Sequence, residues 1–327
     1  MKSVYLRPLF FIVMIILFWQ CAPDSSQSLT AEMSAEIAML PTESGAMGYL
    51  NIKSIKNSPF FALVEENLEE NPVYSEEYQE FIEATGLDVR TDIDEIYFTF
   101  TQNEMEDDPS LFAVINGNYQ PERIMAYIME EQEGSELQEK RFKEYTLYLV
   151  DDGEFAICFT DNNRLIAGNE KSIQEWLEKG TLGQKNELSE STKKNIDKLK
   201  YNKQCWMLMD AQKFVTEMMD EFNHRQSENF QGLKSLQSLN FSIHFDDNMK
   251  FHALGQFEDA EKAGLFRDAM KGFVATAKLS MSEDRDAIDV LNKIKIDTKK
   301  DEVVMQFKMS QEDIKKLKEK RKAWAIK

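Results

Sequence analysis

The chain has 327 residues, of which 42% are hydrophobic, and carries a formal net charge of -19 from 39 Lys and Arg against 58 Asp and Glu. This length and hydrophobic content are enough for two packed domains of ordinary size. The negative field repels phosphate backbones and no basic stripe interrupts the sequence, so the composition argues against a nucleic-acid-binding protein.

The first 20 residues have the pattern of a secretory signal peptide. Lys2 and Arg7 form a charged start, the apolar run of 9–19 follows, and Gln20 and Cys21 come next. The apolar run is too short to span a bilayer, which favours the hydrophobic region of a signal peptide over a membrane-spanning helix.

A signal segment that ends on Cys21 resembles a bacterial lipoprotein signal. The resemblance implies that Cys21 becomes the mature N-terminus, that its thiol carries diacylglycerol, and that its amine is acylated with a palmitate-type chain. Two or three acyl chains give stable membrane anchoring. The usual lipoprotein box has Leu three residues before the Cys and a small residue just before it, whereas here Phe18 and Gln20 occupy these places and Leu17 lies one position early. An uncleaved signal anchor and an ordinary cleavage site remain the alternatives.

The stretch 21–34 begins with the small and polar run Ala22 to Ser28, which predicts a tether between the membrane and the folded part. Thr30 can cap a first helix that Pro41 ends. The first structural unit is predicted over 35–183. Its expected elements are a strand at 46–52, helices at 58–68 and 75–86, a strand at 95–100, a strand and helix at 113–131, strands from 145 and 154 joined by the turn Asp151-Asp152-Gly153, a strand at 164–168, and a helix that Asn169 caps and Gly180 ends.

The same order of elements returns in a second unit, predicted over 184–327. Ala113, Ile115, Gly117 and Tyr119 align without gaps with Phe251, Ala253, Gly255 and Phe257, and alternate residues of a strand share one face of a sheet. The second unit is expected to contain a connecting helix within 184–200, a strand from 205, a helix carrying Phe214, Met218 and Phe222, a strand at 239–245, a helix from Asp259 to about Ser282, two strands and a closing helix. In the alignment of the two units, Ile314 of the closing helix corresponds to Ile173 and Leu317 corresponds to Trp176. The fold class predicted is therefore α+β, two tandem copies of a strand-helix-strand-strand-helix-meander-helix unit with antiparallel sheets.

The two remaining cysteines, Cys158 and Cys205, lie in apolar strand-like segments of different units. This placement favours two buried free thiols over a disulfide, and no CxxC redox motif exists.

Histidines supply the one pair that could bind a metal. A hairpin turn on Asp247, Asn248 and Met249 would pair Phe245 with Phe251 and His244 with His252 on the outer face of the sheet. Two solvated histidines are the favoured interpretation, and a two-His metal site is the alternative, because no third ligand is evident. No phosphate-binding loop or nucleophile motif is present, so we assign no catalytic residues and no cofactor.

Three further patterns have a structural and a functional interpretation. The acidic residues Asp88, Asp92, Asp94 and Glu95 indicate a capped turn rather than a calcium loop. Met and Phe residues are expected to fill the core, although a cavity lined by side chains such as Met125, Phe266 and Met270 could hold an apolar ligand. The basic tail with Trp324 and Ile326 either complements a helix dipole or lies on an anionic membrane.

With its Cys21 signal and repeated units, the chain resembles exported bacterial lipoproteins built from two tandem α+β repeats. The resemblance implies a lipid-anchored protein of the bacterial cell envelope that faces the periplasm or the cell exterior, and it carries over no activity. We therefore expect a non-enzymatic protein that binds or scaffolds a protein partner. A carrier of an apolar ligand or lipid in a cavity between sheet and helices is the alternative, and a hydrolase is third. The sequence assigns no ligand-binding residues.

Overall fold

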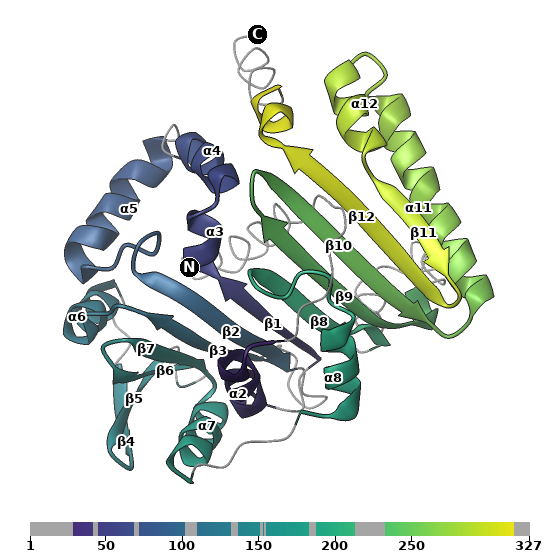
Figure 1. Ribbon diagram of the computed structural model, residues 1–327. Coiled ribbons are helices and arrows are strands. Elements are labelled where there is room, and N and C mark those ends of the chain that lie inside the picture. The colour runs from purple at the N-terminus through teal and green to yellow at the C-terminus, as the bar shows by residue number, and fades with distance from the viewer. Residues whose placement is uncertain are drawn as a thin grey trace.

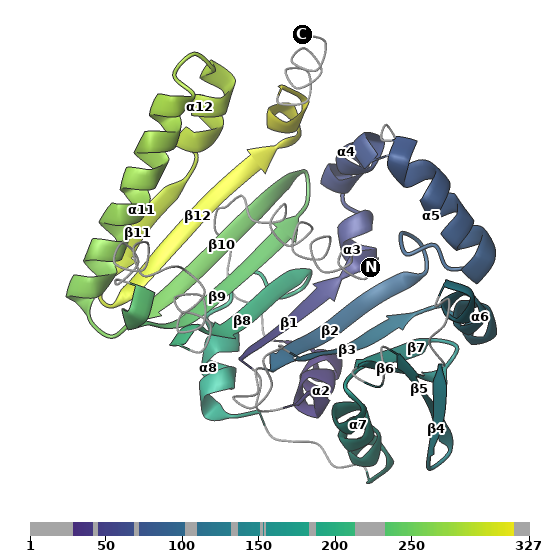
Figure 2. The same ribbon diagram turned by 180° about the vertical axis from the view of Figure 1, so that it is seen from behind.

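The computed structural model describes residues 29–41, 45–68, 72–101, 110–131, 137–150, 153, 155–182, 188–212 and 233–316. These residues form one antiparallel sheet of 12 strands with helices packed on its two faces (Figures 1 and 2). The strand order is β11-β12-β10-β9-β8-β1-β2-β3-β7-β6-β5-β4.

The elements follow one another in two series. The first series is α2 (Ala31–Met39), β1 (Ala46–Asn51), α3 (Ile52–Lys56), α4 (Pro59–Leu68), α5 (Pro72–Thr85), β2 (Ile93–Thr101), β3 (Ser110–Gly117), α6 (Pro121–Glu131), β4 (Gln138–Phe142), β5 (Tyr145–Val150), β6 (Phe155–Asp161), β7 (Arg164–Gly168) and α7 (Glu170–Leu182). The second is α8 (Glu190–Asp197), β8 (Cys205–Asp210), β9 (Leu236–Phe245), β10 (Asn248–Phe257), α11 (Ala260–Ser280), α12 (Arg285–Asn292), β11 (Lys295–Lys299) and β12 (Glu302–Ser310), followed by helical residues 311–316.

The sheet order is symmetric about the pairing of β1 with β8. From this central pair, β2, β3 and β7 follow on one side, and β9, β10 and β12 follow on the other. The strand registers agree with the alignment of the two units. Ala113 lies opposite Phe98 while the aligned Phe251 lies opposite Ile243, and Ile243 aligns with Phe98 when 239–245 is matched to 94–100. The α+β fold of two tandem copies is therefore confirmed, and the two copies share one continuous sheet.

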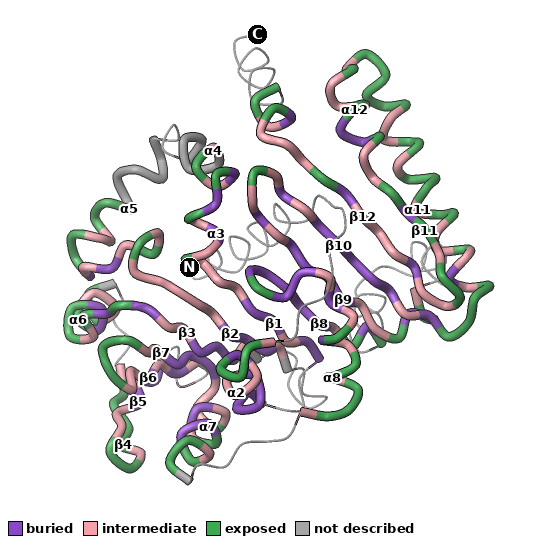
Figure 3. Tube along the Cα trace, viewed as in Figure 1, coloured by how far each residue is buried: buried purple, intermediate pink, exposed green. Residues whose placement is uncertain are grey.

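The two faces of the sheet have separate cores. What we call the α2 face carries Tyr49, Tyr97, Val114 and Trp206, which pack against residues of α2 and α7 such as Ile37 and Ile173. The α11 face carries Phe98, Phe241, Ile243 and Phe251, and α4 and α11 lie over it. Figure 3 shows that burial is concentrated along the central strands.

Capping residues fix several helix ends as the sequence predicts. The Thr30 hydroxyl accepts a hydrogen bond from the Met33 amide at 3.1 Å, the Asn169 side chain accepts one from Ser172 at 2.8 Å, and the Asp259 carboxylate accepts one from Lys262 at 2.8 Å. These bonds satisfy amide groups that have no partner inside the helix. At the other end of α5, Gly86 has a φ of +69°, the left-handed conformation that ends many helices.

Some predicted boundaries are wrong. Helix α5 begins at Pro72 rather than at Ser75, because Pro is well tolerated in a first turn. Helix α7 continues past Gly180 to Leu182. The long helix ends at Ser280, close to the end predicted at about Ser282, and α12, which the sequence did not predict, follows it. Helix α2 begins at Ala31 and so overlaps the end of the 21–34 stretch predicted as a tether.

Other predictions fall partly or wholly outside the described residues. The hairpin of β5 and β6 is present, with Val150 opposite Phe155, although Asp151 and Asp152 of its turn are not described. The helix expected to carry Phe214, Met218 and Phe222, the residue Leu317, and the tail with Trp324 and Ile326 also lie outside the described part of the chain. The division into units at 183 and 184 stays a prediction.

Candidate functional site

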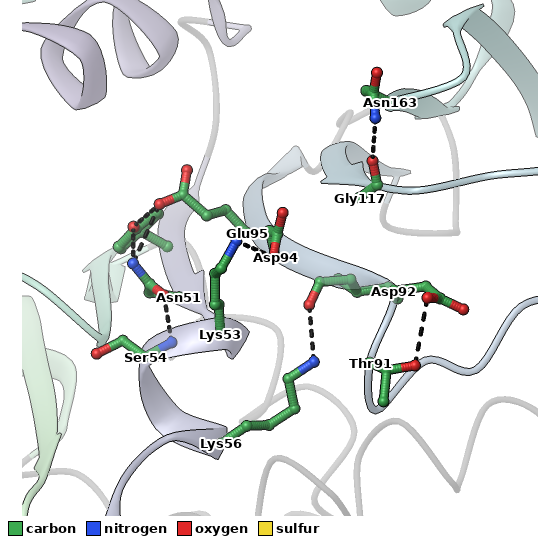
Figure 4. A network of polar contacts seen from close by, with 12 residues as sticks. Asn51, Lys53, Ser54, Lys56, Thr91, Asp92, Asp94, Glu95, Gly117 and Asn163 are labelled. Carbon is green, nitrogen blue, oxygen red and sulfur yellow. Dashed lines mark hydrogen bonds and ion pairs between the residues drawn. The ribbon is translucent and has the colours of Figure 1, made fainter.

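A polar network lies where β1 and β2 meet α3 (Figure 4). The Tyr49 hydroxyl donates to Glu95 Oε1 at 2.6 Å, and the Asn51 amide donates to Tyr49 Oη at 3.0 Å and to Glu95 Oε1 at 3.2 Å. On the other carboxylate oxygen, the Tyr97 hydroxyl donates to Glu95 Oε2 at 3.2 Å. One carboxylate therefore accepts hydrogen bonds from three side chains of two neighbouring strands.

The hydrogen bonds of this network have a structural role. Burial is the main cause of the raised pKa of Tyr49 and of Tyr97. The Glu95 carboxylate raises both pKa values further. Both phenols therefore stay protonated and act as hydrogen-bond donors rather than as bases or nucleophiles. Both tyrosines are only 1% exposed, so no substrate reaches them, and the network stabilises the pairing of β1 with β2.

Asp88 and Asp92, before β2, form capping contacts in a turn, as the sequence predicts, whereas Asp94 and Glu95 lie within β2. Asp88 accepts hydrogen bonds from the amide and guanidinium of Arg90 and from the Tyr78 hydroxyl. Burial opposes ionisation of Asp88, but these hydrogen bonds outweigh it and hold the pKa of this carboxyl at about 2. Asp92 accepts from the Asp88 amide at 2.8 Å, and Asp94 forms an ion pair with Lys53 at 3.1 Å. The carboxylates thus have protein partners in place of a shared cation.

The predicted pairing of His244 with His252 is wrong. Phe245 lies opposite Met249, so His244 lies opposite Lys250 and His252 lies opposite Ser242. The turn closes two residues earlier than expected because the Asp246 carboxylate accepts a hydrogen bond from the Asn248 amide at 2.8 Å.

The two histidines also differ in their surroundings, and only His244 is partly solvated. His244 stacks on Tyr201 with ring centroids 5.6 Å apart. His252 is only 8% exposed, and burial, with a smaller contribution from Lys200, lowers its pKa to about 4. Within the described residues, no group of three or more His, Cys, Asp or Glu side chains is placed to hold a metal ion.

The thiols of Cys158 and Cys205 are free and buried, as the sequence predicts. Burial raises the pKa of Cys158 to about 11 and that of Cys205 to about 12. Since the thiolate is the reactive form, neither cysteine is a nucleophile at neutral pH.

The side chains proposed to line a cavity pack in the core. Met125 is buried, and the Phe266 ring contacts Phe257 with ring centroids 5.0 Å apart. Met270 packs against the same cluster, which includes Ile296. Phe266 and Met270 therefore contact the cluster between α11 and the sheet.

An exposed apolar stripe on α11 is the most distinctive surface feature, and the sequence analysis missed it. Phe266 and Met270 face the sheet, while Leu265 is 64% exposed, Phe273 61% and Leu279 75%. Met281, just after the helix, is 46% exposed. Leu265 and Leu279 were the signal available in the sequence, because they lie away from the side of the helix that carries Ala263, Phe266 and Met270, and a helix that packs on one side needs only one apolar stripe. Phe273 gives no such signal, because it follows Phe266 by seven residues and lies on nearly the same side of the helix. We call Leu265, Phe273, Leu279 and Met281 the α11 stripe.

No helix in the described part of the chain combines the length and the apolar character needed to span a membrane.

Comparisons with known proteins give only a distant structural likeness. No model of a known protein family matches the chain. No curated protein matches it. Similar solved structures include crystal form III of TP0453, with a TM-score of 0.47 and 10% sequence identity over 85% of this chain and 95% of that one. Crystal form I gives a TM-score of 0.45 and 10% identity over 85% and 94%, and crystal form IV gives 0.45 and 9% over 86% and 95%. At these scores the likeness carries no argument about function.

Proposed function

We propose that the chain is a lipid-anchored protein of the bacterial cell envelope that binds a partner protein through the α11 stripe and catalyses no reaction. The α11 stripe is the observation that carries this proposal. Several exposed apolar side chains grouped on one helix mark an interaction site more often than an isolated exposed side chain does.

The geometry of the stripe suits insertion into an apolar groove of another protein. Leu265 and Phe273 are eight residues apart on α11, which places them on one side of the helix two turns apart, and the exposed Ala269 lies between them. Helices that bind grooves present anchors with this spacing. Ala263 and Phe266 pack α11 against the sheet, so the helix is already formed and binding needs no ordering of it.

The support for anchoring comes from the sequence alone. The signal segment that ends on Cys21 supports acylation of that residue, and the folded part then remains at the membrane, facing the periplasm or the cell exterior. The buried thiols, the protonated phenols and the buried His252 support a non-enzymatic function. The packed Phe266 and Met270 give the carrier alternative no separate support.

A site-specific photo-crosslinker tests the binding surface. We would place a benzophenone amino acid at Phe273 of the full chain in its own cells, and at the exposed Lys194 of α8 as a matched control. The proposal predicts an adduct of one discrete protein mass from position 273 and none from position 194. Phe273→Glu should abolish the complex captured at a neighbouring position, Leu265, without lowering the melting temperature. Equal, diffuse crosslinking at both positions would contradict a binding role for α11.

A further inference from the structure

Lysines from distant parts of the chain meet on the α2 face near the β11 edge of the sheet. Lys250 of β10 lies directly opposite Lys308 of β12. Lys295 and Lys299 lie on β11, with the exposed Asp297 between them on the same face. The segment before β8 adds Lys203, because Tyr201 in this segment stacks on His244 and its amide donates to the Ser242 hydroxyl at 3.2 Å. We call Lys203, Lys250, Lys295, Lys299 and Lys308 the lysine strip.

Carboxylates neutralise only part of this charge. Asp246 pairs with Lys250 at 2.5 Å, and Glu302 pairs with Lys198 at 2.7 Å. Among the described residues, Lys295 and Lys308 have no ion-pair partner, and both are exposed. Like charges placed directly opposite each other on neighbouring strands destabilise a sheet, so an anionic surface against this face would relieve the repulsion.

Protection of a sheet edge explains only part of the arrangement. Lysines on an edge strand discourage pairing with another chain, and this accounts for Lys295 and Lys299 of β11. It does not account for Lys250, which lies on β10 between β9 and β12, whereas Lys308 lies on β12 beyond its pairing with β11, which ends at Gln306.

The chain enters the fold from this same face. Helix α2 packs on the α2 face, and the partly buried Leu29 at its start packs against the same core. Only residues 22–28 separate Leu29 from Cys21, so the two lie at most about 28 Å apart even when the chain is fully extended. From β2, under α2, to β12 is five strand steps, or about 24 Å. A lipid on Cys21 would therefore hold the lysine strip within reach of the membrane surface.

We propose that the lysine strip docks the α2 face on an anionic lipid bilayer, so that α11 on the opposite face points away from the membrane towards its partner. The proposal rests on the proposed lipid anchor at Cys21, which sets the distance, while the strip sets the orientation. Anionic lipid headgroups have the complementary charge, and the attraction weakens with salt because exposed charges are screened.

Amine footprinting tests the orientation. The mature protein extracted from its own membranes would be reconstituted into vesicles of phosphatidylcholine alone, or of phosphatidylcholine with about one third phosphatidylglycerol, and acetylated briefly before mass spectrometry. We expect Lys295, Lys299 and Lys308 to react about fivefold more slowly on the anionic vesicles, and the protection to disappear in high salt. Lys271 and Lys278 of α11 should react equally on both.

A pair of matched variants isolates the strip. Lys295→Gln with Lys308→Gln should remove the anionic-lipid protection of Lys299, whereas Lys271→Gln with Lys278→Gln removes the same charge from α11 and should leave it. Equal labelling of the strip on both vesicles, or protection of the α11 lysines instead, would overturn the proposal. An absent lipid anchor can be told apart from an inactive lysine strip, because a chain without covalent lipid would not bind the neutral vesicles.

Discussion

His252 makes a sharp prediction because its environment forces the neutral form. Its ordinary pKa of 6.5 falls to about 4 in the folded protein, chiefly through burial and further through Lys200. Above pH 6.5 the imidazole is neutral in both states and contributes no pH dependence. Between pH 6.5 and 4 the unfolded chain binds a proton that the folded chain does not, so the free energy of unfolding decreases as the pH falls.

The size of the effect follows from the two pKa values. From about pH 7 to about pH 5, His252 should reduce the free energy of unfolding by about 2 kcal/mol, and by about 3 kcal/mol once both states are protonated. Urea unfolding followed by tryptophan fluorescence at these two pH values measures it. In His252→Gln the loss of stability between the two pH values should shrink by about 2 kcal/mol.

His244→Gln is the control, since His244 is half-buried and lies on the same face. Burial lowers the pKa of His244 and the nearby Asp246 opposes this, so its substitution should change the pH dependence less. If His252→Gln retains the full pH dependence of the native protein, His252 is not buried in the neutral form and the packing of β9, β10 and β12 around it is wrong.

Two substitutions test the packing of the sheet by equilibrium unfolding. Gly48→Ala should cost about 2 kcal/mol, because its Cβ would collide with the Phe98 ring, while Gly264→Ala in α11, where the Cβ meets open space, should gain about 0.5 kcal/mol; equal effects would refute the close contact. Asn240→Leu should raise stability by about 1 kcal/mol, since both polar atoms of this amide are buried without a hydrogen-bond partner; a lower stability would mean that the amide is satisfied.

The repeat could be predicted from sequence because alternation in a strand is a strong signal. Ala113 and Phe251 occupy equivalent register positions, as the gapless alignment predicts. The hairpin of β9 and β10 could not be fixed in the same way. A slip of two residues keeps Phe245 and Phe251 on the same face, so the hydrophobic pattern fits both registers equally. The Asp246 side chain, which closes the shorter turn, decides between them.

The surfaces that we propose as functional were harder to predict. The lysine strip combines Lys203, Lys250 and Lys308, which are far apart in the chain and become neighbours only through the order of the strands. No window of the acidic sequence shows such a stripe. The α11 stripe was hidden for another reason, because Phe273 lies on nearly the same side of the helix as Phe266 and is assigned to the core until the structure shows it 61% exposed.

The intact mass of the full-length protein, extracted from its own membranes under mild conditions, tests the central claim most directly. A lipid-anchored envelope protein should give a denatured mass for a chain that begins at Cys21 and carries a diacylglyceryl group, with or without an amide-linked acyl chain. Native and denatured masses should differ by no additional apolar ligand. A chain that retains residues 1–20, or one that is cleaved but carries no covalent lipid, would contradict the account.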